Sequence, residues 1–314
     1  MRTFSRAAAA LAAAAVAVSL AACSSGSSDS GSSSSSGESA SGGSGTDSGA
    51  SAAVLEFPVN AAPDLEGSPT LEAAKSAGTI RVGVKEDQPG LGYLDAISGD
   101  RTGFDVDIAR WIAAELGFSE DQIAFQTIPS ANREQALVNG DIDYYVGTYS
   151  ITDKRKQQIG FAGPYFITGQ GLLVAADNTD ITSEKDLVGK TVCSATGSTP
   201  IQNIRDNFPD TKTTEFDTYS QCVDALKDGS VDAVTTDQAI LIGYAAQEPE
   251  ALKVVGEPFT EEKYGVGVPK DDAALRHYIN KVFTDGGDTW QKIFDADLGT
   301  SGISVEQPAV DDYE

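Results

Sequence analysis

Residues 136–146 read ALVNGDIDYYV, and residues 225–235 read ALKDGSVDAVT, so the phrase Ala-Leu-x-x-Gly-x-(Ile/Val)-Asp occurs twice at an offset of 89. A glycine just after an apolar helical pattern predicts the end of a helix, and the apolar residues behind it predict a strand. The repeat indicates two related lobes. The same phrase ends helices in unrelated chains, so it does not establish a duplication alone.

Strand and helix patterns alternate on both sides of these two stretches. Strands are predicted at residues 79–85, 123–128, 142–146, 172–175, 191–195, 231–235 and 252–255. Helices are predicted at residues 104–116, from a cap at Ser130 to Gly140, after 197–199, at 221–227 and from Gln238. This alternation predicts an α/β fold with mostly parallel sheets faced by helices. At the offset of 89, Thr148 falls opposite Asp237; both lie just past a strand end, where open α/β sheets bind ligands.

Composition excludes several classes of protein. The 314 residues carry 22 Lys+Arg against 47 Asp+Glu, a net charge of −25. Nucleic-acid binding needs Lys and Arg to neutralise phosphates, so this charge argues against it. The only histidine, His277, makes a Ser-His-Asp triad or a histidine-rich metal site improbable. We expect no metal and no cofactor.

The first 22 residues predict a signal peptide. Arg2 and Arg6 precede an apolar run at residues 7–20, which is too short to span a bilayer as a helix. Residues 20–23, Leu-Ala-Ala-Cys, resemble the bacterial lipobox, which predicts cleavage before Cys23 and its lipidation; a plain secretory signal with an incidental cysteine is the alternative. In residues 24–49, 21 of 26 are Ser or Gly, a composition typical of a flexible tether. We also expect a frayed tail at residues 311–314.

The two remaining cysteines are Cys193 and Cys222. An even pair in an exported protein predicts a disulfide. Two free buried thiols are the alternative. A metal site is not supported, because no third soft ligand lies nearby in the sequence.

Five motifs together resemble one family. They are VGVK at 82–85, GFDVDIA at 103–109, SITDKR at 150–155, FAGPY at 161–165 and DAVTTD at 232–237. In order and spacing they are similar to the family 3 extracellular solute-binding proteins, the polar amino-acid receptors of bacterial ABC importers. The resemblance covers residues 79 to about 298 and is nearest to the lipid-anchored glutamate-binding receptors of Gram-positive bacteria, which carry a similarly placed cysteine pair.

The resemblance implies a two-lobe fold of the type II periplasmic-binding-protein kind, with the ligand cleft between the lobes. The implied divisions are a signal peptide at 1–22, an anchor and tether at 23–67, lobe one at 68–168 and 264–303, hinges at 169–171 and 257–263, lobe two at 172–256, and a tail at 304–314. The hinge glycines are expected to absorb the backbone change of lobe closure.

The resemblance also implies roles for the backbone-like part of an amino acid. Arg155 would bind its α-carboxylate through a planar fork, unless Arg155 belongs to a solvated charged run. Asp237 would receive the α-ammonium, with a helix N-cap as the alternative role. Ser198 and Thr199 start a helix whose N–H groups favour anions, and either one would alternatively be only an N-cap. Thr148 and Ser150 would add hydroxyls that donate or accept.

The ligand's side chain is expected to contact Lys85. In receptors for acidic amino acids, a cation at this position binds the distal carboxylate. Arg133 is a second candidate for that distal carboxylate, with a solvated helix surface as its alternative. Glu86 and Asp87 follow Lys85 directly and would favour a cationic ligand if they face the cleft.

The sequence therefore predicts a monomeric, lipid-anchored receptor on the outer face of the bacterial cytoplasmic membrane. It would capture glutamate, or aspartate next, and deliver it to permease subunits driven by a cytoplasmic ATPase. A receptor for glutamine or another polar amino acid is the alternative of the same class. A cyclohexadienyl dehydratase-like enzyme using Glu86 or Asp87, and a stand-alone sensor, are the alternatives of other classes; we expect no enzyme.

Overall fold

A computed structural model describes residues 55–63 and 65–313 of the chain. The predicted signal peptide, the lipidation site at Cys23 and the Ser/Gly-rich stretch at 24–49 lie outside the described residues. No helix within the described ranges is long and apolar enough to cross a membrane.

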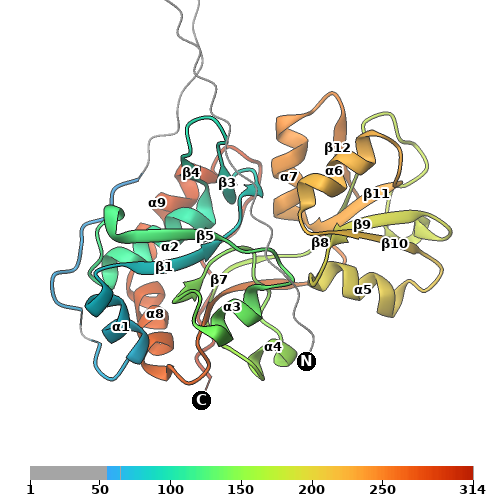
Figure 1. Ribbon diagram of the computed structural model, residues 1–314. Coiled ribbons are helices and arrows are strands. Elements are labelled where there is room, and N and C mark those ends of the chain that lie inside the picture. The colour runs from blue at the N-terminus through green and yellow to red at the C-terminus, as the bar shows by residue number, and fades with distance from the viewer. Residues whose placement is uncertain (1–54, 64, 314) are drawn as a thin grey trace, which may run out of the picture. The chain divides into compact units, whose positions relative to one another are not determined.

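The first lobe is built on a five-stranded sheet in the order β5-β1-β6-β13-β7 (Figure 1). Its strands are β1 (Ile80–Val84), β5 (Ile123–Thr127), β6 (Tyr144–Tyr145), β7 (Gly160–Thr168) and β13 (Glu262–Val268). Its helices are α1 (Pro69–Ala77), α2 (Phe104–Glu115), α3 (Arg133–Asn139), α4 (Asp153–Lys156), α8 (Ala273–Asp285) and α9 (Gly287–Asp297), with a 3-10 turn η1 (Glu120–Gln122). A small antiparallel sheet of β2 (Asp87–Gln88), β3 (Gly92–Leu94) and β4 (Arg101–Thr102) is added to it. Aromatic rings such as Phe104, Phe166 and Trp290 fill the core between these layers.

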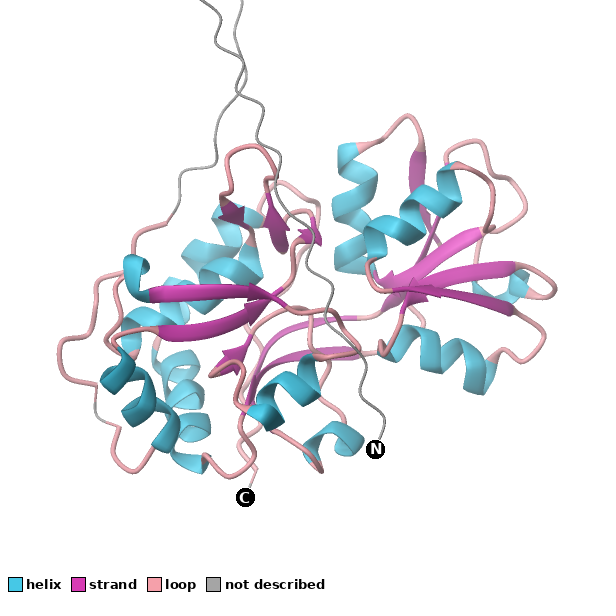
Figure 2. Ribbon diagram, viewed as in Figure 1, coloured by secondary structure: helices cyan, strands magenta, loops and turns pink. Residues whose placement is uncertain are grey.

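The second lobe has its own five-stranded sheet in the order β10-β9-β11-β8-β12, drawn at the right of Figure 1. Its strands are β8 (Gln170–Ala175), β9 (Thr191–Ala195), β10 (Lys212–Phe216), β11 (Ala233–Asp237) and β12 (Leu252–Val255). Its helices are α5 (Thr199–Asn207), α6 (Tyr219–Lys227) and α7 (Gln238–Gln247), with a 3-10 turn η2 (Glu184–Leu187). Figure 2 shows helices covering the strands in each lobe, which is the predicted α/β arrangement.

The expectation of mostly parallel sheets is half right. Strand β1 pairs in parallel with β5 and β6, and β9 with β10 and β11. However, β13 is antiparallel to β6 and β7, and β8 is antiparallel to β11 and β12. The physical reason is the path of the chain. It enters the second lobe through β7 and β8 and leaves it through β12 and β13, and the entering and leaving strands lie side by side and therefore run in opposite directions.

Gly169 lies between β7 and β8 at one of these crossings. A Cβ there would lie 2.2 Å from the carbonyl oxygen of Thr260. Nearby, the Gln170 N–H donates to the Thr260 hydroxyl (2.9 Å) and the Gln170 carbonyl accepts from Phe259 N–H (2.9 Å). Glycine is therefore required at 169 by close backbone approach between the two crossings.

Two local predictions around Ser130 differ from the structure. Helix α3 begins at Arg133 with Asn132 at its N-cap, so Ser130 is not the cap. The following strand is only Tyr144–Tyr145 rather than 142–146. The Ser130 hydroxyl instead accepts a hydrogen bond from Lys85, as described below.

The C-terminal tail is ordered, so the prediction of a frayed end at residues 311–314 is wrong for its described part. The Tyr313 hydroxyl accepts from Phe161 N–H (2.8 Å). Lys156 Nζ and Arg276 Cζ each lie 4.2 Å from the centroid of the Tyr313 ring, and the Arg276 guanidinium donates to the Tyr313 carbonyl. An aromatic residue held between two cations anchors the acidic segment despite its polar composition.

Cys193 and Cys222 form a disulfide, which confirms that prediction. It joins β9 to α6 with the two Cα atoms 5.4 Å apart. The bond therefore ties the first turn of α6 to β9, an interior strand of the second sheet.

Candidate functional site

The predicted ligand-binding residues come together where the two lobes face each other. They lie at or just after strand ends, in the loop between β6 and α4, or in the first turns of helices, and they are Lys85, Arg133, Thr148, Ser150, Arg155, Ser198, Thr199 and Asp237. All of them are buried except Thr199, which is half-buried. Three of them, Arg155, Ser198 and Thr199, line a cavity of about 500 Å³ that opens between α3 and α4 of the first lobe and the start of α5 in the second.

Arg155 lies in the short helix α4, whose N-cap Thr152 accepts from the Arg155 backbone N–H (3.2 Å). Its guanidinium donates to Glu134 Oε1 (2.9 Å), to the Ser150 carbonyl (2.7 Å) and, across the lobes, to the Gly197 carbonyl (3.1 Å). A guanidinium has five N–H donors, so two remain for a carboxylate. With 7% of its surface exposed, Arg155 is not part of a solvated run.

Ser198 is the N-cap of α5, because its hydroxyl accepts from Ile201 N–H (3.3 Å). The Ser198 N–H is used in a turn to the Ala195 carbonyl (3.1 Å). The neighbouring Thr199 hydroxyl points to the other lobe and contacts the Ser150 hydroxyl (3.1 Å). Of the two, Thr199 is the one whose side chain crosses the cleft.

Asp237 ends β11 and stands at the N-cap position of α7, but its side chain makes no capping hydrogen bond. Its Oδ2 accepts from the Tyr264 hydroxyl (2.7 Å), whereas its buried Oδ1 has no partner among the described residues. Burial, reinforced by the nearby Glu262 carboxylate, raises the pKa of Asp237 to about 8. Because the side chain does not cap α7, the plain N-cap alternative is wrong, and one buried carboxyl oxygen has no partner among the described residues.

Lys85 follows β1 and is 4% exposed. Its Nζ donates to the Ser130 hydroxyl (2.7 Å), and no carboxylate of the described chain lies within ion-pair distance of it. Burial, followed by the positive charge of Arg133, lowers the pKa of Lys85 to about 7. A carboxylate arriving beside Lys85 would supply an ion pair that no group of the described chain forms with it, although the charges of Asp87 and Asp105 act on it from farther away.

Arg133 is 2% exposed, so the alternative of a solvated helix surface is wrong. Its guanidinium carbon lies 4.1 Å from the centroid of the Tyr149 ring. One of its amino groups donates to the carbonyls of Gly147 and Thr148 (3.3 Å each), while its buried Nε has no hydrogen-bond partner among the described residues. Arg133 thus adds a second buried positive charge near Lys85.

Thr148 adopts a positive φ of 45°, the only such non-glycine residue in the described ranges. The Asp105 carboxylate supports this conformation by accepting from Thr148 N–H (2.8 Å) and from the Tyr165 hydroxyl (2.7 Å). The Thr148 hydroxyl exchanges hydrogen bonds with the Gln88 amide (3.1 and 3.2 Å). Gln88, which the sequence analysis did not single out, therefore orients Thr148.

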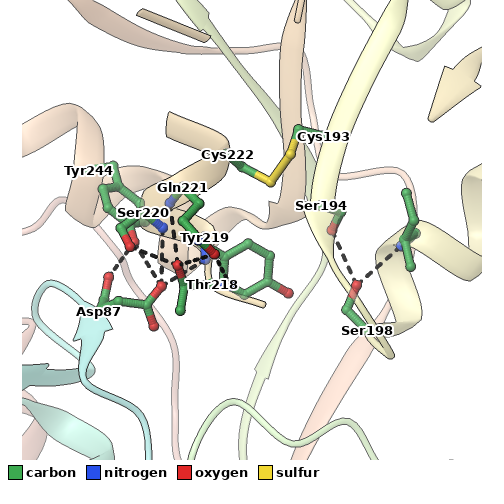
Figure 3. Close-up of a disulfide and its surroundings, with 11 residues drawn as sticks. Asp87, Cys193, Ser194, Ser198, Thr218, Tyr219, Ser220, Gln221, Cys222 and Tyr244 are labelled. Atoms are coloured by element: carbon green, nitrogen blue, oxygen red, sulfur yellow. Dashed lines mark hydrogen bonds between the residues drawn. A yellow bond between two sulfur atoms is a disulfide. The ribbon is translucent and has the colours of Figure 1, made fainter. Parts of the chain in front are cut away.

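Glu86 and Asp87, whose direction the sequence left open, both have partners elsewhere. Glu86 accepts from the Thr127 hydroxyl (2.7 Å) within the first lobe. Asp87 Oδ2 accepts from the backbone N–H groups of Tyr219 (2.7 Å) and Ser220 (3.1 Å), the first residues of α6 (Figure 3). Both carboxylates therefore accept hydrogen bonds from groups of the described protein.

Figure 3 shows how Asp87 reaches from one lobe to the other. The Tyr244 hydroxyl of α7 also donates to the Asp87 carbonyl and contacts its Oδ2 (3.3 Å). Asp87 therefore caps the N-terminus of a helix that belongs to the opposite lobe, where an anion is favoured by the free N–H groups and the helix dipole.

The fold and the facing polar groups define an amino-acid receptor with two lobes. The profile of bacterial extracellular solute-binding proteins, family 3, matches residues 80–296. The chain is 40% identical over 272 residues to the glutamate-binding protein GluB of Corynebacterium efficiens, which covers 82% of this chain and 92% of that one. It is 42% identical over 206 residues to the glutamine-binding protein of Geobacillus stearothermophilus, covering 65% of this chain and 78% of that one.

A solved structure of an amino-acid-binding protein also resembles this chain. An ancestral arginine-binding protein bound to arginine superposes with a TM-score of 0.65 at 38% identity, covering 71% of this chain and 99% of that one. The chain belongs to the family 3 bacterial extracellular solute-binding proteins. The family resemblance and the two-lobe fold expected from sequence are thereby confirmed.

Proposed function

We propose that this protein captures L-glutamate, with L-aspartate as the second acidic candidate. The observation that carries the proposal is the buried Lys85, which has a hydroxyl but no carboxylate for a partner in the described chain. Burying an unpaired charge costs several kcal/mol, so the site is suited to a ligand that brings its own anionic group to Lys85. Arg133, buried beside it, strengthens the same preference.

The α-carboxylate of the ligand is assigned to Arg155. Its two unused N–H donors, one on each terminal nitrogen, are available to a carboxylate, and Arg155 already spans the lobes through the Gly197 carbonyl. The N-terminus of α5, with Ser198 and Thr199 at its start, adds a favourable field for an anion at this end.

The α-ammonium is assigned to Asp237. Its unpaired Oδ1 is a buried acceptor, and an ammonium would supply both the missing hydrogen bond and the charge that ionises the carboxyl group. Thr148 and Ser150 contribute hydroxyl oxygens next to this position.

Ligand capture is proposed to proceed by lobe closure. The moving bodies would be 68–168 with 264–303, and 172–256, joined by hinges at 169–171 and 257–263. A ligand bound to groups of both lobes shifts the population toward the closed form. The hydrogen bonds between Arg155 and Gly197, and between Ser150 and Thr199, support this because each joins the two lobes.

The cellular role we propose is delivery to an ABC importer. Cys23 would carry the lipid that holds the protein on the outer face of the cytoplasmic membrane, and residues 24–49 would act as the tether. The monomer would then present its ligand to permease subunits coupled to a cytoplasmic ATPase.

Glutamine is the second candidate, because a relative at 42% identity is named a glutamine-binding protein. Its neutral amide accepts from Lys85 but does not neutralise it. Glutamine should therefore bind more weakly than glutamate by a clear margin.

Calorimetric titration tests the proposal. The protein from Leu55 onward would be unfolded and refolded to remove retained ligand, then titrated with glutamate, aspartate, glutamine, asparagine, arginine and histidine. Glutamate binding at least tenfold tighter than glutamine supports the assignment of Lys85. Tighter binding of glutamine or of a cationic amino acid would overturn it but keep the receptor class, and no binding at all would refute both.

A further inference from the structure

Glu262 is a buried carboxylate that the sequence analysis did not single out. It is the first residue of β13, at one of the crossings between the lobes, and is 7% exposed. Its Oε2 accepts from the Thr199 hydroxyl (3.0 Å) and its Oε1 from the Thr260 hydroxyl (3.3 Å). Glu262 is thus bonded to a side chain that already reaches across the cleft.

The bond to Glu262 determines the direction of the hydrogen bond between Thr199 and Ser150. A threonine hydroxyl has one proton to donate, and the Thr199 hydroxyl donates it to Glu262 Oε2. Because the Thr199 proton goes to Glu262, the 3.1 Å contact between the two hydroxyls requires Ser150 to donate. The Ser150 oxygen then presents only lone pairs to the cleft.

The same strand also orients the other acceptor of the site. Tyr264, two residues after Glu262 in β13, donates to Asp237 Oδ2 and leaves Oδ1 unpaired. Ser150 itself forms an isolated bridge with Tyr264. Once the ligand's ammonium has ionised Asp237, the Ser150 oxygen and Asp237 Oδ1 are two acceptors organised by β13, which suits a group with several N–H donors such as an ammonium.

We propose that Glu262 is a positioning residue for recognition of the ligand ammonium: by accepting the Thr199 proton it makes the Ser150 oxygen an obligate acceptor toward the ligand. The inference rests on the proposed amino-acid receptor function and deepens it. Glu262 itself does not touch the ligand.

A double-mutant cycle tests this role, with Glu262→Gln, Ser150→Ala and the double variant in the full chain. A glutamine amide can donate to Thr199, so the Thr199 proton is free to turn to Ser150, and the Ser150 proton then points at the ammonium. Each single variant is expected to bind L-glutamate about tenfold more weakly by calorimetry. In the Ser150→Ala background, Glu262→Gln should weaken binding by less than about twofold, since the oxygen on which it acts is gone.

The matched control is Glu261→Gln, which removes the same charge from the neighbouring residue. The Glu261 side chain is exposed and paired with Lys263. It should bind glutamate like the wild type. Thermal unfolding of the ligand-free variants reports whether each is folded.

Equal losses from Glu262→Gln in both backgrounds, in folded proteins, would overturn the positioning role while leaving the receptor intact. A Glu262→Gln variant that binds like the Glu261→Gln control would overturn it too. A wild-type protein that binds no amino acid would refute both this inference and the proposed function, so the two failures are distinguishable.

Discussion

The Asp87→Asn substitution offers the sharpest test of lobe closure. Asp87 accepts two backbone N–H groups at the start of α6, and these bonds join the two lobes (Figure 3). In an open form they would be exchanged for water. The substitution should therefore destabilise the closed form and leave each lobe unchanged.

The magnitude follows from the bonds that are lost. Hydrogen bonds to a charged group contribute about 1.5–3 kcal/mol, and loss of a helix cap costs about 0.5–2 kcal/mol. Asparagine keeps one oxygen that accepts but loses the charge facing the helix dipole, so we expect a loss of about 1–2 kcal/mol. Since every 1.4 kcal/mol is tenfold in affinity, the apparent Kd should rise about 5- to 30-fold.

The assay is calorimetric titration of wild type and variant with glutamate and with the weaker-binding amino acids. Because Asp87 is bonded to protein and not assigned to the ligand, every ligand should lose affinity, with acidic ligands losing somewhat less because the Asp87 charge also acts on Lys85. Asp224→Asn is the matched control, as it removes a carboxylate from the exposed face of the same helix α6. Its affinities should stay near those of the wild type.

Two results would refute this reasoning. An affinity loss confined to one ligand would place Asp87 in the ligand site rather than in a contact between lobes. An unchanged affinity, with the Asp224→Asn control also unchanged, would show that the Asp87 contact does not contribute to closure.

Four further predictions concern groups of the site and the disulfide. Arg155→Lys loses the planar fork, so affinity for every amino acid should fall by about 2 kcal/mol in titration, and a wild-type Kd would remove Arg155 from the site. Burial lowers the pKa of Lys85 to about 7 from 10.5, so between these pH values the unfolded chain binds more protons than the folded protein, and the stability of the ligand-free protein rises with pH. The Lys85→Met variant should show a flatter rise when its stability is measured by urea unfolding from about pH 7 to 9. A slope equal to that of the wild type would contradict the burial of Lys85. Burial raises the pKa of Asp237 to about 8 from 3.8, so the stability of the wild type falls as pH rises between these values. The Asp237→Asn variant should bind no ligand, yet near pH 9 it should melt at a higher temperature than the wild type. A lower melting temperature would contradict the raised pKa of Asp237. Reducing the bond between Cys193 and Cys222, 29 residues apart, should lower the free energy of unfolding by about 3–4 kcal/mol, and an unshifted urea midpoint would mean that the bond does not stabilise the second lobe.

Several site residues were predictable because their signals are local. The motif SITDKR at 150–155 places an arginine in the short helix α4, and Lys85 directly follows a run of strand-forming residues. Such patterns show the periodicity of apolar residues within a short segment. From this periodicity the backbone geometry predicts where each side chain lies on a helix or strand.

Other residues could not be found this way. Asp87 lies 132 positions from Tyr219, whose N–H donates to its carboxylate, and Glu262 lies 63 positions from Thr199. Glu262 stands in an acidic stretch beside the exposed Glu261, and nothing in the local pattern separates the two. Only the second lobe, folded between the two crossings, brings these partners within bonding distance.

The sequence by itself determined the alternation of strands and helices, the family, the cysteine pair and the types of charged residue at the strand ends, because each of these depends on neighbours along the chain. The tertiary structure alone decided which hydrogen-bond partner each buried polar group has. It turned Ser130 from a predicted helix cap into the partner of Lys85, and Asp87 from a candidate ligand group into a cap for the opposite lobe. The physical reason is that a buried carboxylate or ammonium must find its partner in three dimensions, and the fold, not the sequence spacing, sets which groups come within 3 Å.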